Sequence, residues 1–274
     1  MKKNIFVFDL DGTLLTSKEE ISPRTINAIK TLFENGYFII IASGRMYKST
    51  KLVIEKYFPF LKDIPIISYN GAYVVSHTGD VVFESDIEKK DAIEIIQEAK
   101  NENIHVQIYL NDELISDKDN AEIKQYSKHS GVNYKIINNL DEYILKSKNG
   151  PTKVLTIATK EKLDVFQEKM ISKYDHKLNI VRSFNIYLDF LNKDTSKGNA
   201  LKRIAQLYDL DLENAYIFGD SENDISMLVL SKNSYAMNNA SEKVKCAAKN
   251  IAPSNDEEGV AIVIEKILSD ISHY

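Results

Sequence analysis

Short apolar runs that end in polar residues recur through the first third of the chain. Residues 5–8 are followed by residues 9–13 (DLDGT), and residues 37–42 are followed by residues 43–45 (SGR). Unbroken apolar runs of this length are typical of strands buried on both faces, as in a parallel sheet. Between the two runs, Ser22-Pro23 predicts a helix start, because Ser caps helix N-termini and Pro fits the first helical position. The pattern therefore predicts alternating strands and helices.

A change of pattern at residue 86 indicates a second domain. Helix periodicity, at 88–102 and 161–173 for example, is interspersed there with strands that alternate apolar and polar residues. Such alternation is typical of an antiparallel sheet with one face in water. The strand–helix alternation of the first segment resumes after residue 190. We therefore expect an α/β fold, in which a doubly wound, Rossmann-like parallel-sheet core (residues 1–85 and 191–274) carries an inserted α+β domain (residues 86–190).

Charge and composition exclude several classes of function. The 274 residues carry a formal net charge of −5 without a basic tail or stripe. This argues against general nucleic-acid binding, which depends on neutralising phosphates. The apolar run before Asp9 is too short for a secretion signal, and no segment approaches the length of a membrane span. Cys246 is the only cysteine, so no internal disulfide can form, and we expect a reducing, cytoplasmic location.

Carboxylates follow two of the apolar runs, at the edge where open α/β sheets bind ligands. Asp9 and Asp11 come directly after the first run, and Asp220 follows the run 215–218 after a single glycine. Several negative charges in one place are unfavourable unless a cation pairs with them, and Mg²⁺ prefers a few carboxylates together with phosphate oxygens. The sequence therefore predicts a Mg²⁺ site and metal-assisted phosphoryl chemistry.

Further segments carry groups that suit a phosphate, and each also has a plainer interpretation. Ser43 and Gly44 offer a hydroxyl and backbone amides at a helix N-terminus, although a Ser-Gly-Arg turn alone is more often an ordinary loop. Lys197 lies near a helix start, where a cation opposes the helix dipole, so we expect an anion beside it. An isolated lysine is more often simply exposed. The acidic residues at 222–224 suit either this chemistry or the stabilisation of a helix N-terminus.

Four segments, in their order along the chain, resemble the Asp pair, the Ser or Thr, the Lys and the acidic loop of the haloacid dehalogenase superfamily. These segments are residues 9–13, 43–45, 197–198 and 219–224. The Asn70-Gly71-Ala72 turn and the Ser196-Lys197-Gly198 segment are similar to the Cof-type (type IIB) sugar-phosphatase branch. That branch carries its cap domain between the second and third motifs, where the insertion of this chain also lies.

The resemblance implies a Mg²⁺-dependent phosphatase that forms an aspartyl phosphate. Asp9 would attack phosphorus, and Asp11 would protonate the leaving alkoxide and then activate water. The implied metal ligands are Asp9, Asp220 and the carbonyl of Asp11. The implied catalytic and phosphate-binding groups are Ser43, Lys197, Gly44, Asn223 and the amide of Leu10. The supporting positions are Asp224, Ser221, Arg45 and Asn70.

The predicted substrates are small phosphorylated metabolites, with sugar phosphates first among them. The inserted domain is expected to act as a lid that selects the substrate. Its candidate residues, by chemistry alone, are Tyr109, Asn111, Arg182 and Tyr187. One alternative is a phosphomutase, which passes the phosphoryl group back to a sugar. The other is a regulatory or binding module without activity, which requires the loss of a chemical residue, whereas Asp9, Asp11, Lys197 and Asp220 are all present.

One segment departs from the family pattern. Relatives usually read Ala-Met-Gly-Asn-Ala where this chain has AMNNA at residues 236–240, with Asn238 in place of the glycine. Asn adopts a positive φ more readily than most residues do. We therefore expect the loop to form with Asn238 in place of the glycine, with a change at most in its local shape.

Overall fold

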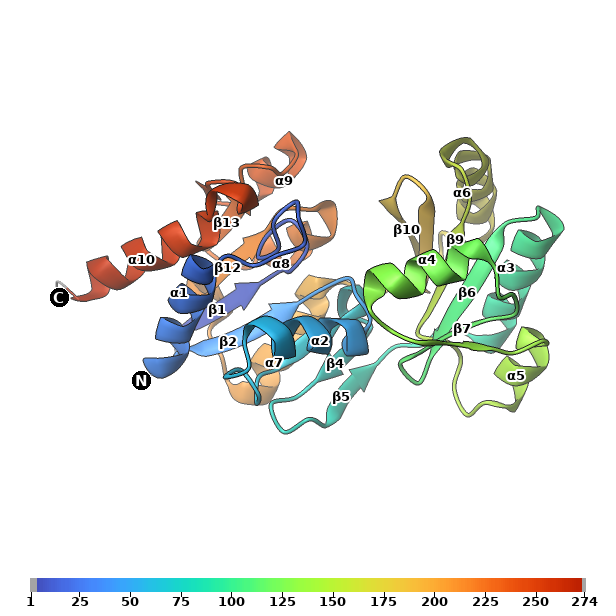
Figure 1. Cartoon of the computed structure of the whole chain (residues 1–274), viewed down its shortest axis with the longest axis horizontal. Coiled ribbons are helices and arrows are strands. Elements are labelled where there is room, and N and C mark those ends of the chain that lie inside the picture. The colour runs from blue at the N-terminus through green and yellow to red at the C-terminus, as the bar shows by residue number, and fades with distance from the viewer. Residues whose placement is uncertain (1–3, 273–274) are drawn as a thin grey trace. The chain divides into compact units, whose positions relative to one another are not determined.

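The computed structural model describes the backbone of residues 4–272 and divides the chain into two compact units (Figure 1). The first, which we call the core unit, runs to Phe83 and resumes at Ser196, and the second, the inserted unit, is Glu84–Thr195. The sequence placed these boundaries at residues 85 and 191. The core resumes later because the segment after the last inserted strand stays bonded to its neighbour, with Asn179 Nδ2 donating to the Thr195 carbonyl at 3.3 Å.

One eight-stranded sheet forms the centre of the core unit. Six of its strands are parallel, and β4 runs antiparallel to β3. In sheet order the strands are β14 (Asn250–Ala252), β13 (Asn233–Met237), β12 (Tyr216–Gly219), β1 (Ile5–Phe8), β2 (Phe38–Ala42), β3 (Ile66–Ser68), β4 (Tyr73–Val75) and β5 (Val81–Glu84). The chain order of the parallel strands reverses between β1 and β12.

Helices cover both faces of this sheet. Alternate side chains of β1 point to opposite faces, so Phe6 and Phe8 join one apolar cluster while Ile5 and Val7 join the other. The helices on the first face are α1 (Pro23–Glu34), α2 (Tyr47–Tyr57) and α10 (Gly259–Ser272), and those on the second face are α7 (Lys197–Tyr208), α8 (Ile225–Leu228) and α9 (Glu242–Ala247). The predicted doubly wound α/β fold is confirmed. Among the described helices, none combines the length and the apolar character that crossing a membrane requires.

The strand register brings several polar segments to one edge of the core sheet. Phe8 pairs with Phe218 on β12 and with Ile41 on β2. The Asp9 N–H then donates to the Phe218 carbonyl at 3.1 Å. The segments that follow β1, β2 and β12 therefore leave the sheet side by side, at its carboxyl edge. They do so at the reversal of strand order, where open α/β sheets bind ligands.

The inserted unit contains a second sheet, of six strands, in which every pairing except β7 with β8 is antiparallel. In sheet order the strands are β10 (Leu178–Phe184), β11 (Tyr187–Asn192), β9 (Lys153–Ile157), β6 (His105–Leu110), β7 (Glu113–Ser116) and β8 (Tyr134–Ile136). Its helices are α3 (Lys89–Asn101), α4 (Ala121–Ser130), α5 (Leu140–Lys146) and α6 (Lys160–Tyr174). Helices α3 and α6 lie within one residue of the predicted ranges. The sequence did not indicate α5, β7 or β8, because such short elements carry too little periodicity.

Candidate active site

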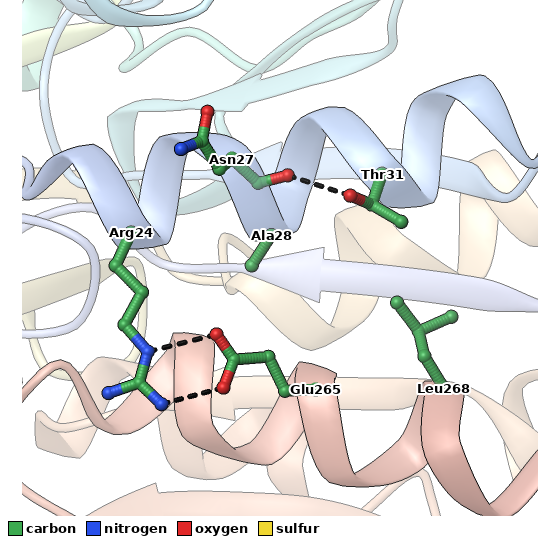
Figure 2. A pocket seen from close by; sticks show the side chains of 6 residues that line it. All are labelled: Arg24, Asn27, Ala28, Thr31, Glu265 and Leu268. Atoms are coloured by element: carbon green, nitrogen blue, oxygen red, sulfur yellow. Dashed lines mark hydrogen bonds and ion pairs between the residues drawn. The ribbon is translucent and has the colours of Figure 1, made fainter.

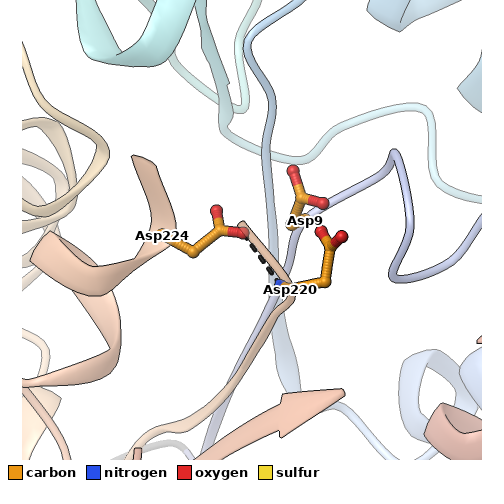
Figure 3. A group of neighbouring side chains, drawn as sticks. All are labelled: Asp9, Asp220 and Asp224. Carbon is orange, nitrogen blue, oxygen red and sulfur yellow. Dashed lines mark hydrogen bonds between the residues drawn. The ribbon is translucent and has the colours of Figure 1, made fainter. Parts of the chain in front are cut away.

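Asp9 and Asp220 lie at the carboxyl ends of the neighbouring strands β1 and β12 (Figure 3). Carboxylate oxygens of these two residues and of Asp224 all lie within 4.8 Å of one another. Asp9 is only 4% exposed, and Asp224 is fully buried. These two buried carboxylates, with the half-buried Asp220 beside them, require positive charge nearby when they are ionised.

Lys197 supplies one positive charge. Its ammonium Nζ donates to Asp9 Oδ1 and to Asp224 Oδ1, each at 2.6 Å, and its side chain is 1% exposed. Burial by itself would lower the pKa of Lys197, but the negative charges of Asp224 and Asp9 raise it above its ordinary value. The anions beside this helix start are therefore two carboxylates of the protein itself.

Asp224 is fixed by the short 3₁₀ turn Glu222–Asp224 in which it lies. Its Oδ2 accepts hydrogen bonds from the backbone N–H groups of Asp220 and Ser221, both at 3.0 Å, while its Oδ1 accepts from Lys197. Both oxygens of Asp224 thus hold protein groups, as part of a capping box with Ser221. The oxygens left for other partners belong mainly to Asp9 and Asp220. The family resemblance implied that Asp224 orients Lys197 or a metal-bound water, but not that Asp224 would also hold the amides of Asp220 and Ser221.

When all three carboxylates are ionised, their three negative charges exceed by two the single charge of the Lys197 ammonium, which is bonded to Asp9 and Asp224. Burial, and next the charge of Asp224, raise the pKa of Asp9 well above its usual value and the pKa of Asp220 to about 7. A divalent cation matches both the missing charge and the oxygen donors. Mg²⁺ in particular binds one or two carboxylates and keeps several waters. Asp9 and Asp220 therefore fit such an ion.

Gly12 lets the loop after β1 pass close to Asp220. Its φ is +78°, and a Cβ at this position would lie 2.2 Å from Asp220 Oδ2, so any side chain here would displace the carboxylate. Asn239 Nδ2 donates to the Gly12 carbonyl at 2.9 Å and ties the loop to the segment after β13. The neighbouring Asn238 is not among the described residues with positive φ. The departure from the family's glycine therefore leaves this backbone unstrained.

Asp11 lies outside the carboxylate cluster. Its side chain is 49% exposed and forms a two-point ion pair with Arg45, from Nε to Asp11 Oδ2 at 2.8 Å and from Nη2 to Asp11 Oδ1 at 2.6 Å. An arginine fork of this kind fixes the orientation of a carboxylate as well as its charge. The sequence left the partner of Arg45 open. In the structure Arg45 pairs with Asp11, the residue predicted to act as acid and base.

Asn70 joins two of the predicted segments. Its N–H donates to the Ser43 carbonyl at 3.1 Å, and its Oδ1 accepts from Asn223 Nδ2 at 2.8 Å. A Cβ on Gly44 would lie 2.9 Å from the same Asn70 oxygen. Within the described part of the chain, Asn223 Oδ1 is buried without a hydrogen-bond partner. The sequence indicated Asn70 as a supporting residue but not its bond to Asn223, because that bond joins residues 153 positions apart.

Two predicted phosphate-binding residues have buried side chains that bond or pack within the protein. Ser43 is fully buried, and its Oγ accepts the N–H of Arg45 at 3.1 Å. The side chain of Leu10 packs in the core, so only its backbone is available to a ligand. Leu10 can therefore serve the site only through its backbone, whereas the Ser43 hydroxyl accepts the Arg45 N–H and keeps its own O–H as a donor.

A cavity of about 530 Å³ lies between α1 and α10 (Figure 2), and its lining residues differ from those of the carboxylate site. Arg24 in this cavity bonds both oxygens of Glu265, at 2.9 and 2.6 Å. The pair satisfies both charges and ties the two helices together. None of the predicted site residues lines the cavity, so we place the chemistry at Asp9 and Asp220 instead.

Known proteins resemble the chain over nearly its whole length. The sequence profile of the haloacid dehalogenase-like hydrolases matches residues 6–264. Phosphatase YwpJ of Bacillus subtilis is 28% identical over 96% of this chain and 99% of its own. The 5-amino-6-(5-phospho-D-ribitylamino)uracil phosphatase YwtE of the same organism is 28% identical over 95% of this chain and 96% of its own. The crystal structure of a Thermotoga maritima protein is similar to this fold, with a TM-score of 0.87. The two sequences are 39% identical, and the match covers 96% of this chain and 97% of the Thermotoga chain.

Proposed function

Because the chain belongs to the haloacid dehalogenase-like hydrolases and is a phosphoric monoester hydrolase, we propose that it hydrolyses small phosphorylated metabolites, sugar phosphates among them. The proposal includes Mg²⁺ as the cofactor and an aspartyl phosphate on Asp9 as the intermediate. The resemblance indicated by the four sequence segments is confirmed at the level of the family. The observation that carries the mechanism is the buried 2.6 Å contact of Lys197 with Asp9, beside Asp220.

Asp9 is the proposed nucleophile. Lys197 holds Asp9 Oδ1, so Oδ2 attacks phosphorus, and the ester P–O bond breaks as the bond to Asp9 forms. Asp11 gives a proton to the leaving alkoxide and then takes one from the water that attacks the aspartyl phosphate, which releases inorganic phosphate and restores Asp9. This role requires Asp11 to exchange its partner Arg45 for the oxygen of the substrate.

Asp9 and Asp220 are the proposed Mg²⁺ ligands, together with the Asp11 carbonyl that the family resemblance implies. When bound, the ion would offset the negative charge of the phosphoryl group and help to orient it. Lys197 offers a second positive charge from the protein side, and Asp224 keeps that ammonium in place. The closeness of the three carboxylates, whose ionised forms would outnumber the charge of Lys197, supports this assignment.

Mg²⁺ is expected to stabilise the folded protein more at pH 8 than at pH 5.5. Without metal, the pKa of Asp220 rises from 3.8 unfolded to about 7 folded. The stability linked to its protonation is therefore fully present below about pH 4 and is lost as the pH rises through about 7. At pH 8 the ionised carboxylates repel one another until a cation binds.

Thermal unfolding with and without Mg²⁺ at the two pH values measures this effect. We expect the ion to raise the unfolding temperature by several degrees at pH 8 and by less at pH 5.5. Asp220→Asn should remove most of the difference between the two pH values. Equal shifts at both pH values in the wild type would count against a Mg²⁺ site on these carboxylates.

Asn70→Gly is expected to lower kcat/KM about tenfold, the equivalent of one hydrogen bond. Asn70 has a φ of +55°, which Gly adopts without strain, so the variant keeps the turn and removes only the amide that holds Asn223. Asn70→Ala should show the same kinetic loss plus about 1–2 kcal/mol of lost stability, because Ala lacks the polar side chain whose hydrogen bonds let Asn adopt a positive φ. Phosphate-release kinetics and thermal unfolding of both variants test this, and wild-type kinetics in Asn70→Gly would contradict it.

A phosphate-release screen tests the proposed function directly. Wild-type protein is assayed with Mg²⁺ on several dozen phosphorylated metabolites and again after chelation. We expect release of inorganic phosphate that stops on chelation. Because YwtE is named for a ribityl phosphate substrate, polyol phosphates belong in the panel. Isomerisation of a sugar phosphate without release would indicate a phosphomutase, and inactivity throughout would favour a binding module.

A further inference from the structure

The two faces of the sheet in the inserted unit differ in chemistry. One face packs under α3, α5 and α6 in an apolar cluster. The other face carries His105, Gln107 and Tyr109 of β6, and all three are buried. Helix α4 lies over this second face (Figure 1), where the Tyr126 ring contacts the Tyr109 ring at 6.2 Å between centroids. A histidine therefore lies in a polar layer between the sheet and α4.

The four residues that the sequence singled out in this unit have different places in the structure. Tyr109 belongs to the polar layer, and the Tyr187 ring lies 5.6 Å from that of Tyr126 on α4. Arg182 forms an ion pair with α6 at 2.9 Å. Asn111 has a φ of +54° and lies in the tight turn between β6 and β7. None of the four is the centre of the layer, which is His105.

The N-terminal cap of α4 fixes the orientation of a side-chain amide beside His105. Asn120 is the cap, and its Oδ1 accepts the backbone N–H of Ile123 at 3.2 Å. A backbone N–H can only donate, so the amide atom that faces it must be the oxygen. The Asn120 Nδ2 group therefore faces His105 Nδ1, at 3.0 Å. Because Nδ2 carries only donors, His105 Nδ1 must accept and carries no proton.

The remaining hydrogen bonds of the layer run in the same direction. With Nδ1 as an acceptor, a neutral His105 holds its proton on Nε2. This Nε2 lies 3.3 Å from Gln107 Oε1, and Gln107 Nε2 donates to Tyr109 Oη at 2.8 Å. Each donor in this row thus meets an acceptor. The row requires the neutral imidazole, because an imidazolium has donors on both ring nitrogens.

A proton on His105 Nδ1 would be unfavourable for three reasons. It would face the Nδ2 donors of Asn120 at a distance where one atom must accept. The side chain of His105 is buried, and burial disfavours a charged ring. The N-terminus of α4 also carries partial positive charge, which opposes a cation beside the cap.

The charged groups around His105 act on it in opposite directions. Burial is the largest influence and lowers the pKa of His105 below its ordinary value of 6.5. The hydrogen bond within the row and the negative charges of Glu122 and Asp117 raise this pKa in part, while Lys118 lowers it further. Asp117 is itself paired with Lys100 at 2.7 Å. The neutral form is therefore the one that the folded unit favours.

We propose that the His105–Asn120 contact is a pH-sensitive switch, in which protonation of His105 releases the Asn120 cap and loosens the first turn of α4. The switch goes beyond the proposed function and does not depend on it. Once Nδ1 holds a proton, Asn120 can bond it only by turning its oxygen toward the ring, and that oxygen then leaves the Ile123 N–H. The stability linked to neutral His105 is present above about pH 6.5 and is lost as the pH falls through the lowered pKa of the folded state.

Helix α5 of the same unit provides an internal reference. Asn139 caps it in the same way, with its Oδ1 accepting the Glu142 N–H at 3.1 Å. Hydrogen exchange of the full-length protein, followed by NMR at pH 7.5 and pH 5, gives the protection of both amides relative to an unstructured chain at the same pH. From pH 7.5 to pH 5 we expect the protection of Ile123 to fall about fivefold relative to that of Glu142, the equivalent of one lost N-cap.

Asn120→Asp is expected to reverse this response. Aspartate caps a helix as well as asparagine does, and its carboxylate can accept from a protonated Nδ1. The affinity of His105 for a proton, measured from the NMR shifts of its ring nitrogens, should rise about tenfold or more. The protection of Ile123 should then no longer fall at pH 5. Asn139→Asp, the same change on α5, is the control and should leave the titration of His105 as in the wild type.

His105→Asn removes the titrating group. Its side-chain oxygen lies near the position of Nδ1 and can still accept from Asn120, so the cap should persist. The variant also assigns the ring signals of His105 by their disappearance. We expect the ratio of Ile123 to Glu142 protection to be the same at both pH values. Because both amides belong to one unit, a general loss of stability affects them alike and leaves this ratio unchanged.

Several results would overturn the switch. One is a wild-type protection ratio that stays constant while His105 titrates. Another is a His105 that remains neutral at pH 5, or whose neutral form carries its proton on Nδ1. A proton affinity that Asn120→Asp leaves unchanged would also count against it. A falling ratio in the wild type, absent in both His105→Asn and Asn120→Asp, supports it.

Discussion

Asp9→Asn is expected to lower kcat for phosphate release by about four orders of magnitude or more, as loss of a covalent nucleophile does in other enzymes. Asn keeps the size of the side chain and an oxygen for Lys197 Nζ, which lies 2.6 Å from Asp9 Oδ1 in the wild type. A carboxamide is not a nucleophile toward phosphorus, so no aspartyl phosphate forms. Phosphate release at saturating substrate with Mg²⁺ measures the loss, and mass spectrometry of acid-quenched protein detects the phosphorylated chain in the wild type only.

Asp270→Asn is the matched control, because Asp270 is an exposed residue of α10 and belongs to no part of the site. It should release phosphate at the wild-type rate. Turnover by Asp9→Asn within tenfold of the wild type, or phosphorylation of the chain at another residue, would refute the assignment of Asp9 as nucleophile. Either outcome would leave the family membership unaffected.

Lys197→Met is expected to lower kcat/KM about a thousandfold and also to destabilise the protein. The ammonium is the shared partner of Asp9 and Asp224, at 2.6 Å from each, and is positioned to face the charge that develops on a phosphoryl group. Removing one preorganised donor of this kind typically lowers rates by about 10²–10³. Breaking a buried ion pair from one side costs about 3–5 kcal/mol, because the remaining charges stay buried without a partner.

Steady-state kinetics and thermal unfolding of Lys197→Met, with Lys202→Met as control, test both effects. Lys202 is exposed on the same helix, so its variant should match the wild type in each measurement. Mg²⁺ should bind Lys197→Met at least as tightly as it binds the wild type, because the competing positive charge is gone. A variant that keeps wild-type kcat/KM would show that the lysine only balances charge in the fold.

The elements of the core were predictable because their signals are local. The run 5–8 is apolar on every residue, and the structure buries it on both faces as β1. Ser22 caps α1 through its side chain, with Pro23 first in the helix, as the Ser-Pro pair indicated. The inserted unit was predicted less completely, since strands as short as Tyr134–Ile136 have no measurable period.

The chemistry of the site was predictable as a set of residues but not as an arrangement. The sequence named Asp9, Lys197 and Asp220 as partners, and the strand register does bring them to one edge of the core sheet. The resemblance implied that Asp224 orients Lys197 or a metal-bound water, but nothing indicated that its other oxygen would hold backbone amides. Nor did it indicate that Arg45 would hold Asp11, because a side chain's partner depends on which strands lie next to each other.

Motif order, strand-end placement and the excess of acidic groups follow from the amino-acid order alone, since each depends on residues that are neighbours in the chain. The pairing of Lys197 with Asp9 spans 188 positions, and that of Arg45 with Asp11 spans 34. Only folding decides such contacts, because the strands that carry them become adjacent when the sheet forms. The gathering of Asp9, Asp220 and Asp224 around one space, with Lys197 bonded to two of them, is therefore a property of the tertiary structure.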